Sequence, residues 1–246
     1  MTVTFNLYDH LVSRRRDNKL YPSLASSWSA VQPTVWQFKL RPGVKFHNGD
    51  PFTSADVKFS IERTYDPQAK TNVSTIFTTV DRVETPDALT VNFVTKKPDP
   101  LLPARLAFYG GQIIPKKYFE AVGADQFNAK PVGTGPVRFV SWRKDDQLVF
   151  DAVPDYWGGR VAFNRLVFRP IPETAVRVGA LLKGEVDMIS KLPPDSLEQV
   201  RNHPTTKVES ILFAGQFVLA VNSKRPPLDN PVVKQALSSP SIARPS

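Results

Sequence analysis

The stretch PVGTGPVRFVSW, residues 131–142, contains a glycine-rich turn of the kind that can bind phosphate. Gly133, Thr134 and Gly135 would let backbone N–H groups approach an anion. A phosphate loop needs a Lys followed by Ser or Thr at a helix start, and a dinucleotide fingerprint needs three spaced glycines. Here Pro136 removes an N–H donor, and an alternating apolar run follows. We therefore predict a stiff structural turn that leads into a β-hairpin.

The three histidines are the next candidates for catalysis or metal binding. His10, His47 and His203 lie far apart in the sequence, and none has a second ligand or a nucleophile at a useful spacing. Paired carboxylates for acid–base chemistry cannot be selected among 23 acidic residues without geometry. The absence of cysteine excludes disulfides and thiolate metal sites. We predict a non-enzymatic protein with no catalytic residue, metal site or cofactor.

Charge and composition narrow the class of protein. The formal net charge is +9 over 246 residues, and Arg14, Arg15 and Arg16 form the densest basic run. The other basic residues are spread beside acids, which is typical of a solvated surface and leaves a nucleic-acid-binding protein as the less favoured alternative. A hydrophobic content of 41% can bury a core, and no apolar run approaches the roughly 20 residues of a membrane span.

Caps, breakers and periodicity predict a mixed α/β or α+β protein. Thr53 or Ser54 can cap a helix with Asp56 in its first turn, and residues 173–183 and 194–202 are expected to form two more helices. The expected strands and hairpins are 36–40 with 44–46, 89–93, 137–142 with 147–152, and 186–189. The aromatic residues expected in the core are Trp36, Phe38, Phe139, Trp157 and Phe168.

Five segments, taken in order, resemble the landmarks of one protein family. They are LYPSLASSWSAVQPTVWQFKLRPGVKFHNGDPFTSADVKFSIERTYDP (20–67), PVGTGPVRFVSW, PDYWGG, FRPIPETAVRVGALLKGEVDM and VNSKRPPLDNPVVKQAL. The resemblance is to the family 5 extracytoplasmic solute-binding proteins, the peptide, opine and nickel receptors of bacterial ABC importers. It covers nearly the whole chain, and it implies that the turn at 133–135 is a scaffold element.

The resemblance implies a periplasmic-binding-protein-like lobe with an inserted second domain. Residues 1–12 and 116–212 would form the first lobe, residues 13–115 the inserted α+β domain, and residues 213–246 the crossover into a third domain. Family members are longer, and they begin with a signal peptide that the N-terminus here does not resemble. After Leu237 the chain reads SSPSIARPS where the family continues as an apolar helix. We therefore expect truncation at both ends, with the third domain missing.

The resemblance also suggests ligand contacts. Tyr109 would lie on the wall of the second domain, whereas Ser190 and Lys191 would line the cleft after a strand. The crossover would add Phe213, Gly215 and Gln216. Ordinary structural roles remain open for these residues, such as core filling for Phe213 and a solvated charge for Lys191.

The function implied is that of a truncated solute-binding protein of an ABC importer, periplasmic by family. It would capture oligopeptides, dipeptides or metal chelates without chemistry and would meet the importer's membrane permease, but not nucleic acid. A degenerate fragment that binds nothing is the alternative. In this family the ligand lies between the first and third domains. Because the third domain is expected to be missing, we expect an open surface that binds ligand weakly.

Overall fold

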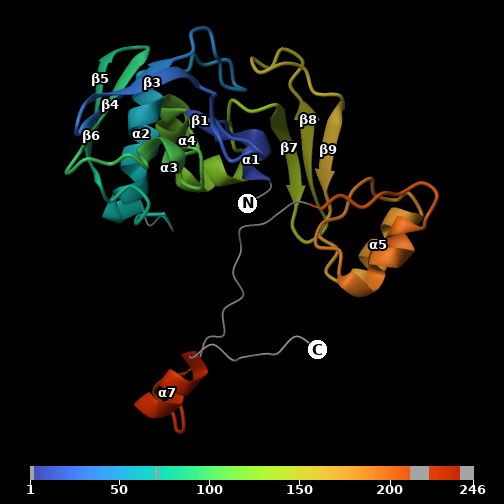
Figure 1. The fold of residues 1–246 in the computed structure, drawn as a ribbon. Coiled ribbons are helices and arrows are strands. Elements are labelled where there is room, and N and C mark those ends of the chain that lie inside the picture. Colours follow the sequence, from blue (N-terminus) through green and yellow to red (C-terminus); the bar gives the residue numbers. More distant parts are fainter. Residues whose placement is uncertain (1–2, 70, 72, 211–221, 239–246) are drawn as a thin grey trace. The chain divides into compact units, whose positions relative to one another are not determined.

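The computed structural model describes residues 3–69, 71, 73–210 and 222–238. The chain divides into two compact units, residues 1–171 and 172–246. Helices and antiparallel sheets are mixed along the chain, which confirms the predicted mixed α/β fold class (Figure 1). In the part of the chain that the structure describes, every helix is too short or too polar to cross a membrane.

A four-stranded antiparallel sheet organises the larger core of the first unit. Its order is β3 (Ala25–Gln32), β4 (Val35–Leu40), β6 (Thr90–Thr95) and β5 (Val80–Asp87). Helix α2 (Ser54–Tyr65) packs on this sheet, because Val57 and Ile61 on one helix face join Phe38 and Phe93 in a single buried cluster. All four side chains are fully buried, so the sheet and α2 form one hydrophobic core.

The start of α2 is fixed by a capping box, as the sequence predicts. Thr53 is the N-cap, and its backbone N–H donates to Asp56 Oδ2 at 2.9 Å. The other oxygen of Asp56 accepts a hydrogen bond from the backbone N–H of Lys116, also at 2.9 Å. One carboxylate thus satisfies backbone donors at the N-termini of α2 and of α4 (Lys116–Ala129).

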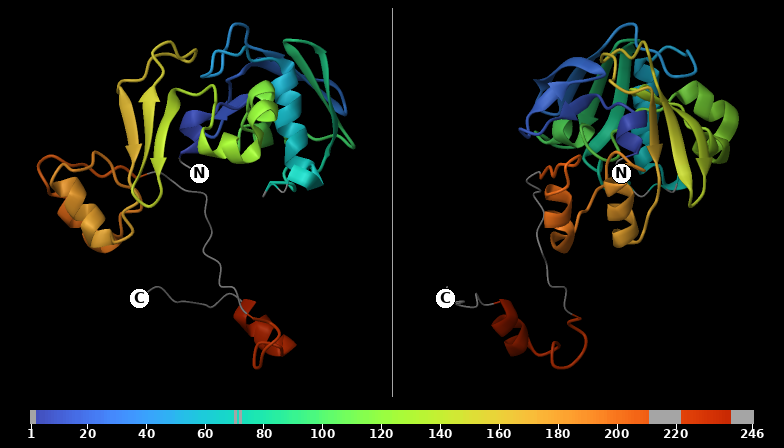
Figure 2. Two further views of the ribbon diagram at one scale, coloured as in Figure 1. Left: turned by 180° about the vertical axis from the view of Figure 1, so that it is seen from behind. Right: turned by 90° about the vertical axis from the view of Figure 1, so that its right-hand side faces the viewer.

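A second sheet contains the predicted hairpin. Strands β7 (Val137–Arg143), β8 (Gln147–Ala152) and β9 (Arg165–Phe168) are antiparallel in that order. Helix α1 (Thr4–Leu7) lies between this sheet and α4 (Figures 1 and 2). The apolar side chains that meet there form a second buried cluster: Leu7, Tyr8, Phe127, Val137 and Phe150.

The remaining elements of the first unit are short. They are β1 (Val12–Arg14), β2 (Leu20–Pro22), the 3-10 helix η1 (Pro67–Ala69) and α3 (Leu102–Leu106). The second unit contains α5 (Thr174–Leu182), the 3-10 helix η2 (Pro194–Ser196), α6 (Leu197–Arg201) and α7 (Pro231–Ser238). The predicted helices at 173–183 and 194–202 are therefore confirmed, the second with a 3-10 first turn.

The glycine-rich turn packs against the backbone of the N-terminal segment. A Cβ atom added at Gly133 would lie 2.0 Å from the carbonyl oxygen of Leu7, and one at Gly135 would lie 2.4 Å from that of Asn6. The N–H of Gly135 donates to the Leu7 carbonyl at 3.0 Å. Only glycine allows backbones to approach this closely, so the turn is a packing element, as predicted.

His47 ties a second loop to the same turn. Its ring Nδ1 accepts a hydrogen bond from the N–H of Gly133 at 3.3 Å, and Nε2 lies 2.9 Å from the carbonyl oxygen of Gly135. Its backbone N–H donates to the Gly133 carbonyl at 2.9 Å. Since Nδ1 is an acceptor, Nε2 carries the proton, and burial lowers the pKa of this imidazole. The polar groups of the turn are thus used within the protein.

Two of the predicted strands are wrong. Strand β4 pairs with β3 and β6, whereas residues 44–46 contribute only an isolated bridge between Lys45 and Pro51. Strand β3 was not predicted. Most of its residues are exposed, and its sequence therefore lacks the alternation of apolar and polar residues that indicates a strand. Residues 186–189 form no strand, since no neighbouring strand among the described residues of the second unit pairs with them.

The predicted aromatic core is confirmed most clearly at Phe38. This ring is fully buried and packs edge-on against Phe93, with centroids 5.3 Å apart. The other four predicted residues, Trp36, Phe139, Trp157 and Phe168, are half-buried. Trp142, at the outer end of β7, is 61% exposed instead.

We expect Phe38→Ala to lower the free energy of unfolding by about 3–5 kcal/mol, because it removes a fully buried ring and leaves a cavity. Trp142→Ala is the matched control and should change it by less than about 0.5 kcal/mol. Chemical denaturation of both variants measures the difference, and equal effects would contradict this description of the core.

We expect Gly133→Ala to destabilise the protein by about 1–3 kcal/mol or more, since its Cβ would overlap the Leu7 carbonyl. Gly179→Ala is the control, because this glycine lies inside α5 with no neighbouring atom within 4 Å of a Cβ. That change should stabilise its helix by about 0.5–1 kcal/mol. Calorimetry of both variants tests this, and a neutral Gly133→Ala would refute the close approach.

Candidate ligand-binding surface

Three partly exposed aromatic side chains form the most prominent candidate for ligand contact in the first unit. Phe5 is 38% exposed, Phe108 51% and Tyr109 36%, although large aromatic residues are usually buried. They come from α1 and from the segment after α3, where Gly110 and Gly111 follow. We call this group the aromatic shelf. Rings with one open face can stack on planar groups or cover apolar side chains of a ligand.

The buried ring of His10 links the parts of the shelf. It stacks on Phe5 with centroids 4.9 Å apart and hydrogen-bonds to the backbone of Phe108. Burial lowers the pKa of His10 to about 4, so the imidazole is neutral near pH 7. Its Nε2 has no hydrogen-bond partner. His10 therefore acts here as a neutral platform beneath the shelf.

The neighbouring Asp9 lies in a separate buried cluster. Its two carboxylate oxygens accept hydrogen bonds from the Tyr156 hydroxyl at 2.9 Å and from the Trp157 indole N–H at 2.8 Å. The guanidinium of Arg41 lies over the Trp157 ring, 4.9 Å from its centre. Burial raises the pKa of Asp9 to about 6, against the effect of these hydrogen bonds. The PDYWGG motif is thus anchored to the N-terminal segment.

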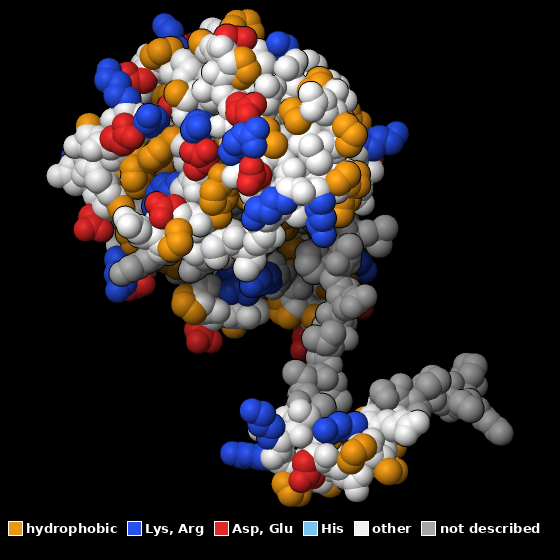
Figure 3. Space-filling view, turned by 90° about the vertical axis from the view of Figure 1, so that its left-hand side faces the viewer, with side chains coloured by type: hydrophobic (Ala, Val, Ile, Leu, Met, Phe, Trp, Pro, Cys, Tyr) orange, Lys and Arg blue, Asp and Glu red, His pale blue; other side chains and the backbone are white. Residues whose placement is uncertain are grey.

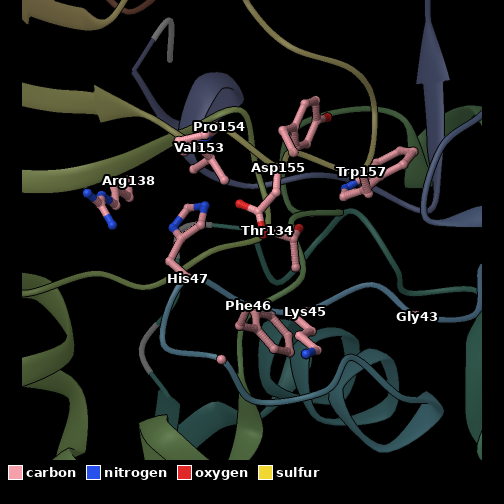
Figure 4. Close-up of a pocket in the computed structure, with 12 residues that line it drawn as sticks. Gly43, Lys45, Phe46, His47, Thr134, Arg138, Val153, Pro154, Asp155 and Trp157 are labelled. Atoms are coloured by element: carbon pink, nitrogen blue, oxygen red, sulfur yellow. The ribbon is translucent and has the colours of Figure 1, made fainter.

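A cavity of about 400 Å³ lies beside the glycine-rich turn (Figure 4). Lys45, His47, Arg138 and Asp155 contribute charged or polar groups to its wall. In Figure 4 the side chains of Lys45 and Arg138 lie on different sides of the cavity and do not converge. The ring nitrogens of His47 are already engaged with the turn. The cavity therefore lacks the convergent donors that would hold an anion.

The side chains of Asp9 and His47 are engaged by the scaffold. A general base must reach a nucleophile, whereas Asp9 and His47 face hydrogen-bond donors or acceptors of the scaffold. Among the described residues, no three His, Asp or Glu side chains gather closely enough to hold a metal ion. The surface offers aromatic rings and backbone groups, which suit non-covalent recognition.

The predicted ligand residues fall in different parts of the chain. Tyr109 belongs to the shelf in the first unit. Ser190 and Lys191 are exposed and adjacent in an irregular segment of the second unit, and Lys191 has a left-handed backbone with φ 59°. Such a conformation is uncommon for Lys and is often found where backbone geometry serves function. Phe213, Gly215 and Gln216 lie outside the described residues.

Sequence reasoning missed Phe5, His10 and Phe108 as members of this surface. Phe5 lies in a short helix and Phe108 follows one, so each reads as an ordinary core residue. The pair Gly110-Gly111 was an available signal, because Gly111 lies against the backbone of Leu106, and a Cβ there would approach its carbonyl oxygen to 2.5 Å. That contact turns the chain directly after Phe108 and Tyr109.

A mixed α/β fold with exposed aromatic side chains is compatible with the class of bacterial solute-binding proteins. Residues 19–239 match the family described as "Bacterial extracellular solute-binding proteins, family 5 Middle". The chain belongs to this family.

Individual relatives agree with this assignment. Di/tripeptide-binding protein 2 of Pseudomonas aeruginosa is 32% identical over 88% of this chain and 45% of its own length. Glutathione-binding protein GsiB of Pectobacterium atrosepticum is 30% identical over 96% of this chain and 46% of its own. The structure of MoaA from A. tumefaciens R10 with mannopinic acid superimposes with a TM-score of 0.86 at 31% identity, covering 96% of this chain and 49% of that one. The chain spans about half the length of these relatives.

The raised pKa of Asp9 predicts a specific pH dependence. A raised carboxyl pKa stabilises the fold below the ordinary value, and this contribution is lost as pH rises through about 6. Since the pKa of Asp9 rises from 3.8 to about 6, the free energy of unfolding falls by about 3 kcal/mol. We therefore expect the stability of the native protein relative to Asp9→Asn to fall between pH 4 and pH 7.

Denaturant titrations of both proteins at several pH values measure this difference. His47 is present in both proteins, so its contribution cancels in the difference. That contribution has the opposite sign, because the pKa of His47 is lowered. A difference that stays constant from pH 4 to pH 7 would show that Asp9 titrates normally.

Proposed function

We propose that this chain supplies ligand-binding surfaces of an ABC importer's solute-binding protein. The ligands would be oligopeptides, dipeptides or metal chelates, captured without a chemical step. The setting would be the periplasm, where the loaded protein meets the membrane permease. Family membership together with the exposed aromatic shelf carries this proposal.

The chemistry of the shelf supports a peptide or a chelate of similar size. Rings that are 36–51% exposed can cover the apolar or planar part of such a ligand. In the second unit, Ser190 and Lys191 add a hydroxyl and a cation that suit a ligand carboxylate. Phe213, Gly215 and Gln216 remain predicted contacts.

We also propose the division of the chain into domains. Residues 1–12 and 116–212 would form the first lobe, residues 13–115 the inserted domain, and residues 213–246 the crossover. The composition of the two buried clusters supports this proposal. Apart from Leu11 and Val12, the buried members of the larger cluster lie within residues 13–115, and the smaller cluster joins Leu7 and Tyr8 to residues after 116.

We expect dipeptides and tripeptides to bind the purified chain weakly. The expected dissociation constant is about 1 mM, which corresponds to a binding free energy of about −4 kcal/mol. The side chains of the shelf are 36–51% exposed, so water competes for each ligand group. Phe108→Ala combined with Tyr109→Ala should weaken this binding at least several-fold. Titration calorimetry with a peptide library and with nickel–histidine chelates measures the effect. Trp142→Ala, which removes a more exposed aromatic side chain on β7, is the control.

Two results would contradict the proposal. If no peptide or chelate stabilises the chain at about 100 mM, a hundredfold excess over the expected dissociation constant that should add about 2.7 kcal/mol, the chain is a non-binding fragment. If ligands bind but the double variant binds equally well, the family function holds and the shelf is not the site.

A further inference from the structure

The turn between β1 and β2 concentrates positive charge on an exposed tip. Residues 14–19 contain four basic side chains, Arg14, Arg15, Arg16 and Lys19, and a single acid, Asp17. All six residues are exposed. On the face shown in Figure 3, several Lys and Arg side chains lie next to Asp or Glu side chains. Among the described residues, no carboxylate lies within 4 Å of any of the four cationic groups, and Arg15 interacts with Asp17 only at longer range.

The one acid of this turn is used to hold its shape. Asp17 Oδ1 accepts a hydrogen bond from the N–H of Lys19 at 3.0 Å, and Oδ2 accepts one from the Tyr21 hydroxyl at 2.8 Å. Asn18 adopts a left-handed backbone with φ 62°, which suits a tight turn. Arg15 stacks on the Tyr21 ring, 4.1 Å from its centre. The cations are therefore presented by an ordered turn.

The base of the hairpin is anchored in the larger core. Leu11 and Val12, directly before the basic residues, are fully buried. The strands pair in register from Val12 with Pro22 to Arg14 with Leu20. The N–H groups of Leu24 and Ala25 donate to the carbonyls of His10 and Leu11 at 3.0 and 2.9 Å. The basic turn is therefore attached firmly to the larger hydrophobic core.

We propose that this basic turn, residues 14–19, docks on the anionic phospholipid headgroups of a membrane surface. Headgroup phosphates match the guanidinium and ammonium donors. A protein partner would require an apolar or aromatic centre to its interface, and residues 14–19 provide none. A convex tip with outward cations fits a flat, negatively charged plane, and its purely polar surface makes the contact peripheral and reversible. Docking would keep the protein near a membrane without occupying the aromatic shelf.

Co-sedimentation of the full chain with lipid vesicles tests the proposal. We expect binding to vesicles containing phosphatidylglycerol, weaker binding at raised salt, and little binding to pure phosphatidylcholine. Each Lys or Arg at such a surface contributes about five-fold in partitioning, so Arg14→Gln/Arg16→Gln/Lys19→Gln should lower it by about 100-fold. The control Lys97→Gln/Lys130→Gln/Lys144→Gln removes the same net charge from exposed, scattered positions and should have a much smaller effect.

Three outcomes would overturn the proposal. The first is equal binding to phosphatidylcholine. The second is an equal loss in the two triple variants, which would indicate a response to net charge alone. The third is unchanged binding in the turn variant. Thermal unfolding of each variant checks that the fold is intact, and adding free inorganic phosphate at the same charge concentration separates headgroup binding from simple anion binding. Peptide titration of the turn variant should be unaffected, which keeps this test separate from that of the proposed function.

Discussion

The close approach of two backbone segments, residues 6–7 and residues 133–135, is the constraint on which the first unit depends. Gly133 and Gly135 allow carbonyl oxygens to lie where any side chain would clash. This contact fixes the entrance of β7 beside α1, and so places the three-stranded sheet over the second hydrophobic cluster. His47 then attaches the loop after β4 to the same turn through its ring and its backbone.

The N-terminal segment consequently contributes both to the core and to the proposed binding surface. Leu7 and Tyr8 fill the smaller core, and Asp9 holds the PDYWGG motif through two hydrogen bonds. Phe5 and His10, from the same few residues, build part of the aromatic shelf. Because one short segment performs both roles, the shelf inherits its rigidity from the packing below it. Such support is what a binding site needs if its aromatic rings are to stay in place before the ligand arrives.

Much of this fold was predictable from local sequence signals. Thr53 and Asp56 predict the start of α2, because they can cap a helix. The alternation of apolar and polar residues after Pro136 predicts β7. Strand β3 was not predictable in this way, because its exposed residues receive their conformation from pairing with β4. The family motifs pointed to Tyr109, but not to Phe5 or Phe108. Their exposure results from how α1 and the segment after α3 meet in space, which no spacing in the sequence encodes.

The bridge between His10 and Gln112 brings two distant points of the chain together. The N–H of Ile113 also donates to the carbonyl of Asp9 at 3.1 Å, so the chain leaves and re-enters at the same place. The residues of the larger buried cluster run from Leu11 to Ile113, which is the segment between these two points. During evolution, a segment whose two ends lie side by side can be exchanged as a unit. If residues 13–115 form the proposed inserted domain, recombination could replace or resize that domain while the backbone contacts of His10 with Gln112 and of Asp9 with Ile113 are kept.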